Sequence, residues 1–185
     1  MRPLFIILLL CGSLCCSAQN SFNDGKEERI KKVDFPKNAI ELLKNTLPKE
    51  VEEIQYYKEQ DPVKSSYEAK LKYKGKKYRI EFSEKGILED VKVTIKAKNI
   101  KPRTLEMIKK HMYNTYTSFR FKKIRRQYQN NNSQPKKVIR NGFLGDTKSG
   151  FSYEIIAEVK KKKKRYFIEI TFTKDGNFKS VRTIF

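Results

Sequence analysis

Residues 67–95 read YEAKLKYKGKKYRIEFSEKGILEDVKVTI, and the expected fold class rests on this segment. Apolar residues occupy every second position in three successive segments, which Gly75 and Gly86 separate. Successive side chains of a strand point to opposite faces of a sheet, so each segment presents one apolar and one charged face. An antiparallel sheet with one face in water gives this pattern. The stretch therefore predicts a β-meander.

The same pattern returns near the C-terminus. A Tyr-Glu pair opens each copy, at Tyr67 and at Tyr153, and Gly176 takes the place of the turn glycine Gly86. The interval between pair and glycine differs by an even number of residues, so every side chain keeps its own face. We therefore predict an α+β fold, built as two tandem copies of a helix packed on a mostly antiparallel four-stranded sheet.

A helix and a strand are expected before each meander. Apolar residues fall at helical spacing in two segments, Ala39, Ile40, Leu43 and Leu47, and Leu105, Ile108, Met112 and Tyr116. Strands are expected at 51–56 and 119–124. The first repeat then covers residues 35–98 and the second covers 99–185. Residues 127–150 are rich in Asn, Ser, Gly and Lys, and we expect a mobile insertion there.

The first 18 residues have the pattern of a secretory signal. Arg2 precedes a short apolar run, and small residues precede a cleavage point after Ala18. A lipoprotein signal is the alternative, although none of Cys11, Cys15 and Cys16 follows the small residues that a lipobox requires. Residues 19–34 are polar without periodicity, which predicts a disordered lead-in. We expect an exported protein, periplasmic or secreted.

Cleavage would remove all three cysteines, so disulfides, thiol catalysis and cysteine metal ligands are excluded from the mature chain. It would also remove Arg2, which lowers the net charge from +21 to +20. An exported chain rarely meets nucleic acid, so nucleic acid is not an expected partner. Anionic envelope polymers or lipid headgroups fit the charge better. A general lysine bias on solvated faces is the simpler explanation, because net charge speaks to solubility rather than to fold.

Catalysis is not expected. His111 is the single histidine of the chain and lies inside the expected second helix, without a serine or acidic motif. The sequence contains no Gly-rich phosphate loop, zinc-ligand pair or nucleophile elbow. We predict no catalytic residue, no metal and no cofactor.

The polar face of the predicted sheets is the first candidate surface. Its candidate partner-binding residues are Lys70, Lys72, Arg79, Lys92, Ile156, Glu158, Phe167 and Glu169. Ile156 and Phe167 are apolar where the first copy is charged. They form either a contact between the copies or an exposed recognition spot.

The second candidate surface is a run of basic residues at the expected tip of a hairpin. Its members are Lys160, Lys161, Lys162, Lys163, Lys164 and Arg165. The run is either a docking point for an anionic surface or a solvated turn that discourages edge-to-edge pairing of sheets.

The apolar skeleton resembles the PepSY-like family of secreted bacterial proteins, whose tandem form is similar in architecture to the β-lactamase inhibitor protein. The resemblance rests on the helix around Ile40 to Pro48, the two Tyr-Glu pairs, and the turns ending in Gly86 and Gly176. Phe82 and Phe172, four residues before those glycines, complete it. The resemblance covers 35–185, and the segment 127–150 departs from the family pattern.

The resemblance implies a non-catalytic envelope module that binds a protein or peptide partner through its sheet surface, with inhibition of a peptidase or other hydrolase as one role. It transfers no contact residue. We expect a monomer. The alternative function is a basic envelope-associated protein that holds anionic polymer or lipid headgroups electrostatically.

Overall fold

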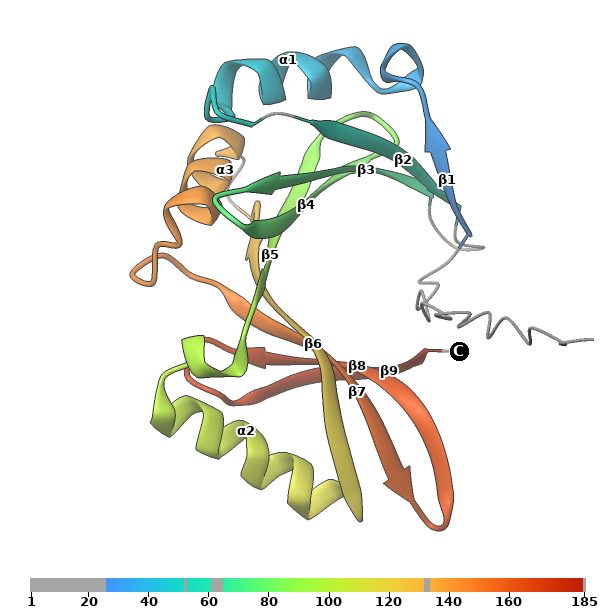
Figure 1. The fold of residues 1–185 in the computed structure, drawn as a ribbon, viewed down its shortest axis with the longest axis vertical. Coiled ribbons are helices and arrows are strands. Elements are labelled where there is room, and N and C mark those ends of the chain that lie inside the picture. The colour runs from blue at the N-terminus through green and yellow to red at the C-terminus, as the bar shows by residue number, and fades with distance from the viewer. Residues whose placement is uncertain (1–25, 52, 61–64, 132–133, 185) are drawn as a thin grey trace, which may run out of the picture.

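The computed structural model describes residues 26–51, 53–60, 65–131 and 134–184. These residues form one nine-stranded antiparallel sheet in which the strands follow the order of the chain (Figure 1). The strands are β1 Lys26–Ile30, β2 Ile54–Gln60, β3 Ser65–Tyr73, β4 Lys76–Ser83, β5 Leu88–Ile95, β6 Ser118–Gln129, β7 Ser152–Lys161, β8 Lys164–Thr173 and β9 Phe178–Ile184. The helices are α1 Lys37–Thr46, α2 Pro102–Thr115 and α3 Pro135–Leu144, with 3-10 turns at Lys32–Asp34 and Ala97–Asn99.

The predicted fold class, two tandem copies of a helix on a four-stranded sheet, was wrong. β5 pairs with β6 from Asp90 opposite Gln129 to Ile95 opposite Ile124, so the sheet is continuous where a boundary was expected. A strand at the edge of a sheet leaves its N–H and C=O groups unpaired. The long strand β6 supplies partners to β5 on one side and to β7 on the other. The individual elements of the meander, β3 to β5, and the helices α1 and α2 are confirmed.

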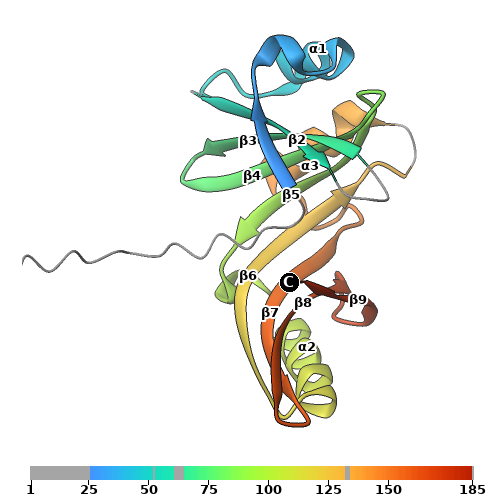
Figure 2. The same ribbon diagram turned by 90° about the vertical axis from the view of Figure 1, so that its right-hand side faces the viewer.

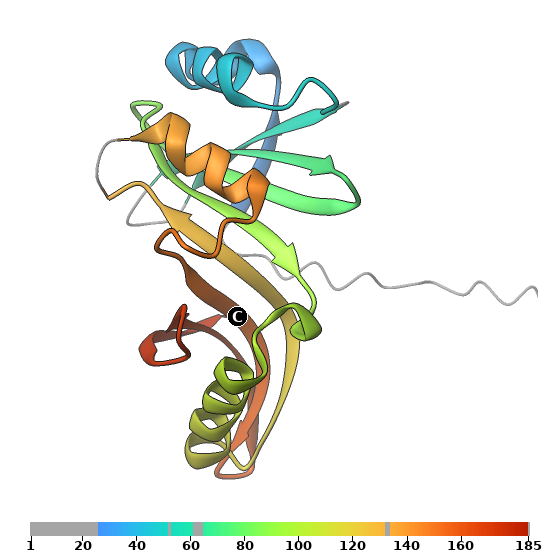
Figure 3. The same cartoon turned by 90° about the vertical axis from the view of Figure 1, so that its left-hand side faces the viewer.

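All three helices lie on one side of the sheet. Figure 3 shows α2 and α3 in front of the strands, whereas Figure 2 shows β6 and β7 from the side that these helices leave open. The helix-bearing side holds two apolar clusters. The first joins Phe35 and Leu43 to β2–β5, and the second joins Ile108 and Met112 to β6–β8. Phe82 and Phe172 are fully buried, one in each cluster.

Each turn glycine packs on the first turn of a helix. Gly86 has φ +68°, and a Cβ there would lie 2.2 Å from Asn38 Oδ1. The Asn38 amide donates hydrogen bonds to the carbonyl oxygens of Lys85 and Gly86, at 2.9 and 3.1 Å. Gly176 has φ +93°, and a Cβ there would lie 2.9 Å from the carbonyl oxygen of Thr104 in α2. Glycine is required at both turns because other residues rarely adopt positive φ.

The structure differs from expectation in two further segments. Residues 26–30, placed in the lead-in, form the edge strand β1. Residues 127–150, expected to be an insertion, continue β6 to Gln129 and then form α3. Phe143 of α3 stacks on Tyr78 with 4.4 Å between ring centroids, so the helix belongs to the first apolar cluster.

The proposed signal, residues 1–18, lies outside the described residues. Within the described part of the chain, no helix has both the length and the apolar character needed to cross a membrane.

Candidate partner-binding surface

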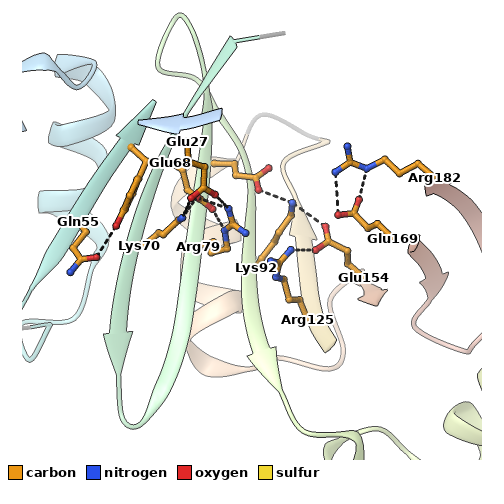
Figure 4. Close-up of polar contacts among 12 residues, drawn as sticks. Glu27, Gln55, Glu68, Lys70, Arg79, Lys92, Arg125, Glu154, Glu169 and Arg182 are labelled. Carbon is orange, nitrogen blue, oxygen red and sulfur yellow. Dashed lines mark hydrogen bonds and ion pairs between the residues drawn. The ribbon is translucent and has the colours of Figure 1, made fainter. Parts of the chain in front are cut away.

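No described helix covers the side of the sheet opposite α1, α2 and α3, and we call this side the helix-free face. The alternation of each strand places its charged residues here. Several of these charged side chains are nevertheless buried, and many form ion pairs with side chains of neighbouring strands (Figure 4).

The first of two ion-pair clusters joins β1, β3 and β4. Its members are Glu27, Glu68, Lys70 and Arg79. The Arg79 guanidinium donates to both Glu68 carboxylate oxygens, with 2.7 Å between Arg79 Nη2 and Glu68 Oε2, and reaches Glu27 Oε1 at 2.5 Å. Lys70 Nζ pairs with Glu27 and lies 3.2 Å from Glu68 Oε2. Glu68 is 0 % exposed. A buried carboxylate needs such partners, since an unpaired buried charge is costly.

The second cluster joins β4 to β7. Its members are Glu81, Lys92, Arg125 and Glu154. Lys92 Nζ lies 2.6 Å from Glu81 Oε1 and 3.0 Å from Glu154 Oε2, so it links β4 to β7 across β6. Arg125 pairs with the other Glu154 oxygen. Arg125 is 2 % exposed and Glu154 is 3 % exposed.

These pairings shift the pKa values of their members. Burial acts against the charged amine of Lys92, but the surrounding carboxylates of Asp90, Glu81 and Glu154 raise its pKa well above the ordinary value. Burial alone would raise the pKa of Glu154, but Lys92 and Arg125 lower it to about 2. Both groups are therefore charged at neutral pH.

A polar hollow of about 460 Å³ lies beside the second cluster and spans β4 to β9. Its lining residues are Glu81, Glu89, Asp90, Lys92, Gln127, Gln129, Asn131, Glu154, Glu169, Thr171, Lys179 and Ser180. Asp90 is 6 % exposed, and its Oδ2 accepts a hydrogen bond of 2.6 Å from Gln127 Nε2. Burial raises the pKa of Asp90 to about 7, although Lys92 acts in the opposite direction.

A second carboxyl group of the helix-free face also has a pKa close to 7. Burial, followed by the nearby carboxylates of Glu81, Glu68 and Glu27, raises the pKa of Glu59 in β2 to about 7. Carboxylates thus outnumber the cations that pair with them at the centre of this face, in a chain whose net charge is +21.

The structure brings most of the predicted partner-binding residues together on the helix-free face. Lys70, Arg79 and Lys92 belong to the two clusters, and Glu169 pairs with Arg182 of β9 at 2.9 Å. Glu158 pairs with Lys122 at 3.0 Å and with Arg165 at 3.3 Å. Lys72 is exposed near the β3–β4 turn, opposite Lys77, outside these ion pairs.

The two apolar candidates differ from each other in exposure. Ile156 is 1 % exposed, so it is not an exposed recognition spot. It lies between Lys123 of β6 and Glu169 of β8 in register. Phe167 is half-buried, and Lys122 Nζ lies 5.9 Å from its ring centroid.

The basic run forms the tip of the β7–β8 hairpin. Lys161 pairs with Lys164, so Lys162 and Lys163 are the two central residues of the turn. Both have positive φ, 48° and 67°. Residues 161–165 are exposed and Lys160 is half-buried.

His111 has a packing role. Its ring stacks on Phe178 at 4.8 Å between centroids and meets the edge of Phe172 at 5.4 Å. Among the described residues, no group of His, Cys, Asp or Glu side chains gathers as metal ligands would.

Several members of this surface were not among the predicted site residues. Glu68, Glu81, Asp90 and Glu154 alternate with apolar positions, so strand periodicity placed them on the polar face but gave no sign of their burial. Arg125 and Gln127 continue the alternation of β6 past the predicted end of that strand. Glu27 lies in a segment whose polarity indicates disorder, and no signal in the sequence marks it.

No protein-family model matches the chain. No curated protein matches its sequence either. Several solved structures are similar to it, and two of them are as follows. A DUF2874 family protein from Bacteroides ovatus is 13 % identical, with a TM-score of 0.54, and the match covers 80 % of this chain and 87 % of that one. A BLIP-like protein from Bacteroides fragilis is 16 % identical, with a TM-score of 0.50, over 80 % and 86 % of the two chains. The chain therefore has a BLIP-like fold.

Proposed function

We propose that the chain is an exported, monomeric, non-catalytic module that binds a protein or peptide partner through the helix-free face of its sheet. One observation carries the proposal: this face holds buried, mutually paired charges although no described helix covers it. Burying such ion pairs costs desolvation energy, so they add little to the stability of the fold. They do fix the positions of polar groups before a partner arrives, which lowers the entropic cost of binding.

The fold supports this role. One solved structure with the same fold is named for its likeness to BLIP, the β-lactamase inhibitor protein. A binding role, including inhibition of a peptidase or other hydrolase, is therefore part of the proposal. The apolar skeleton and turn glycines support a PepSY-like relationship, and the sequence pattern of residues 1–18 supports export to the periplasm or beyond.

Capture from an envelope extract at two salt concentrations tests the function. The bait is the chain without residues 1–18, and captured proteins are identified after washes at about 0.05 M and 1 M salt. Exposed charge interactions are screened within about 3 Å at 1 M salt, so a protein retained at high salt would support a packed interface. Retention of polymer or lipid alone, released by salt, would contradict the proposal.

The basic hairpin favours a second candidate function, binding to an anionic envelope polymer or lipid surface. Lysine is unfavourable at positive φ, where Asn and Gly are preferred, yet Lys162 and Lys163 occupy both such positions. The two lysines therefore lower the stability of the turn while they keep its positive charge. Co-sedimentation with phosphatidylglycerol vesicles tests this candidate, because the double variant Lys162→Asn/Lys163→Gly keeps the turn type and removes two charges. Equal binding of the variant would overturn it.

A further inference from the structure

The hollow beside the second ion-pair cluster differs in charge from the chain as a whole. Five carboxylates line it, from Glu81, Glu89, Asp90, Glu154 and Glu169, against the two amines of Lys92 and Lys179. The whole chain has twice as many basic as acidic residues, 42 against 21. The lining is therefore richer in carboxylates than in amines, although Arg125 and Arg182 pair with Glu154 and Glu169 from beside the hollow.

Both amines of the hollow are already engaged. Lys92 bridges Glu81 and Glu154, as described above, and Lys179 Nζ lies 3.1 Å from Ser152 Oγ. The Oδ1 atom of Asp90 is buried and has no hydrogen-bond partner in the described part of the chain. Asp90 is 94 % buried, since 6 % of it is exposed. A buried acceptor without a donor is costly, and more so when it is charged.

We propose that the hollow receives the ammonium or guanidinium group of a lysine or arginine side chain from the protein partner. The inference rests on the proposed function, which supplies the partner. An organic cation with several N–H donors fits a wall of separate carboxylate and amide oxygens, because each donor can find its own acceptor. The lining does not bring together the acidic side chains that a metal ion would require.

The chemistry of Asp90 agrees with a cationic guest. The groups that act on its pKa are Glu81 on β4, Lys92 on β5, Gln127 on β6 and Glu154 on β7, and Glu89, Glu169 and Lys179 also line the hollow. Burial, followed by the carboxylates of Glu81 and Glu154, raises the pKa of Asp90 to about 7, although Lys92 and the hydrogen bond from Gln127 act in the opposite direction. A bound cation would stabilise the ionised carboxylate, as any opposite charge at short range does.

An NMR titration tests the inference directly. The probe is N-acetyl-glycyl-lysyl-glycinamide, and the control probe is the same peptide with its lysine amine acetylated. We expect saturable amide shifts confined to β4–β9 with the first peptide and none with the second. Asp90→Asn should raise the dissociation constant of the first peptide at least tenfold. The control variant Glu106→Gln removes one negative charge from an exposed position on α2, and it should change the dissociation constant by less than twofold.

A second variant keeps the inference falsifiable if Asp90→Asn fails to fold. Thr171→Lys places an ammonium group of the chain's own in the hollow and should abolish the shifts. Equal binding of the acetylated peptide, or undiminished binding by a folded Asp90→Asn or Thr171→Lys variant, would overturn the inference. The proposed function stands or falls separately. If a partner still binds the helix-free face while Asp90→Asn leaves its affinity unchanged, only the assignment of the hollow is lost.

Discussion

Asp90 of β5 accepts a hydrogen bond from Gln127 of β6, with 2.6 Å between Asp90 Oδ2 and Gln127 Nε2. The bond satisfies one oxygen of a carboxyl that the sheet buries, and the other oxygen has no partner among the described residues. Burial makes ionisation of Asp90 unfavourable in the folded chain, although the hydrogen bond from Gln127 acts in the opposite direction. The burial therefore connects the stability of the fold to pH.

The first prediction concerns that connection. The folded pKa of Asp90, about 7, lies above its ordinary value of 3.8. The folded state therefore holds the proton more tightly than the unfolded state, and the free energy of unfolding falls as pH rises from about 4 to about 7. Asp90→Asn cannot ionise, so it should gain about 1–3 kcal/mol relative to wild type between pH 5 and pH 8.

Urea denaturation of both proteins at pH 5, 6.5 and 8 checks this prediction. Comparing the free energies of unfolding of the two proteins at the same pH cancels the pH effects that other titrating groups have on both of them. A difference between the two proteins that stays constant with pH would show that Asp90 ionises as freely in the fold as in the unfolded chain.

The second prediction concerns the buried ion pairs. Glu154→Gln removes the carboxylate that Lys92 and Arg125 share. Breaking a buried pair from one side leaves an uncompensated charge, so the free energy of unfolding should fall by about 3–5 kcal/mol. Arg165→Gln removes a partner of Glu158 whose side chain is 66 % exposed, and it should cost less than about 1 kcal/mol. Similar losses in the two variants, measured by urea denaturation, would contradict the burial of the second cluster.

The sequence predicted the individual strands and helices well, but it did not predict how the strands join into one sheet. Period-two alternation located β3, β4 and β5, and helical spacing located α1 and α2, because these patterns depend on which face each residue presents. The same alternation cannot say whether β5 is an edge strand or pairs with β6. Whether β5 pairs with β6 depends on contacts between residues that lie far apart in the sequence. For this reason two separate sheets were predicted where the structure has one.

The candidate site shows the same division. Alternation put Lys70, Arg79 and Lys92 on one face, as the structure has them. It could not show that Glu68 and Glu154 are buried there, because strand periodicity assigns a charged face to water. Glu27 and α3 were missed because polar segments and short helices rich in Lys and Asn resemble loops, and their apolar contacts form only in the folded chain.

The third prediction concerns the basic hairpin. Lys162→Asn/Lys163→Gly replaces two residues at positive φ with residues that favour it. The double variant should raise the free energy of unfolding by about 1 kcal/mol or more, since a left-handed conformation costs an ordinary residue about 1–2 kcal/mol. A lower urea midpoint in the variant would mean that the lysines stabilise the turn, which would remove the argument for a functional charge at this tip.

The fourth prediction concerns the turn glycines. Gly86→Ala introduces a Cβ that would meet Asn38 Oδ1 at 2.2 Å and Pro36 Cβ at 2.6 Å. Gly75→Ala is the matched control, because Gly75 also has positive φ, +71°, but a Cβ at this position would meet no atom within 4 Å. Both variants suffer backbone strain of about 1 kcal/mol. Gly86→Ala should lose at least about 1 kcal/mol more, which thermal denaturation of both variants would measure.

The proposed function requires that a partner reaches the helix-free face, so a label that blocks this face should prevent binding. The chain without residues 1–18 has no cysteine, so Thr94→Cys on the helix-free face and Lys109→Cys on the exposed side of α2 each create a single labelling position. Each is coupled to maleimide-polyethylene glycol and used as bait at high salt. We predict that the label at position 94 abolishes capture of a protein partner and that the label at position 109 leaves it intact. Capture that survives the label at position 94, or that is lost with the label at position 109 alone, would contradict binding through the helix-free face.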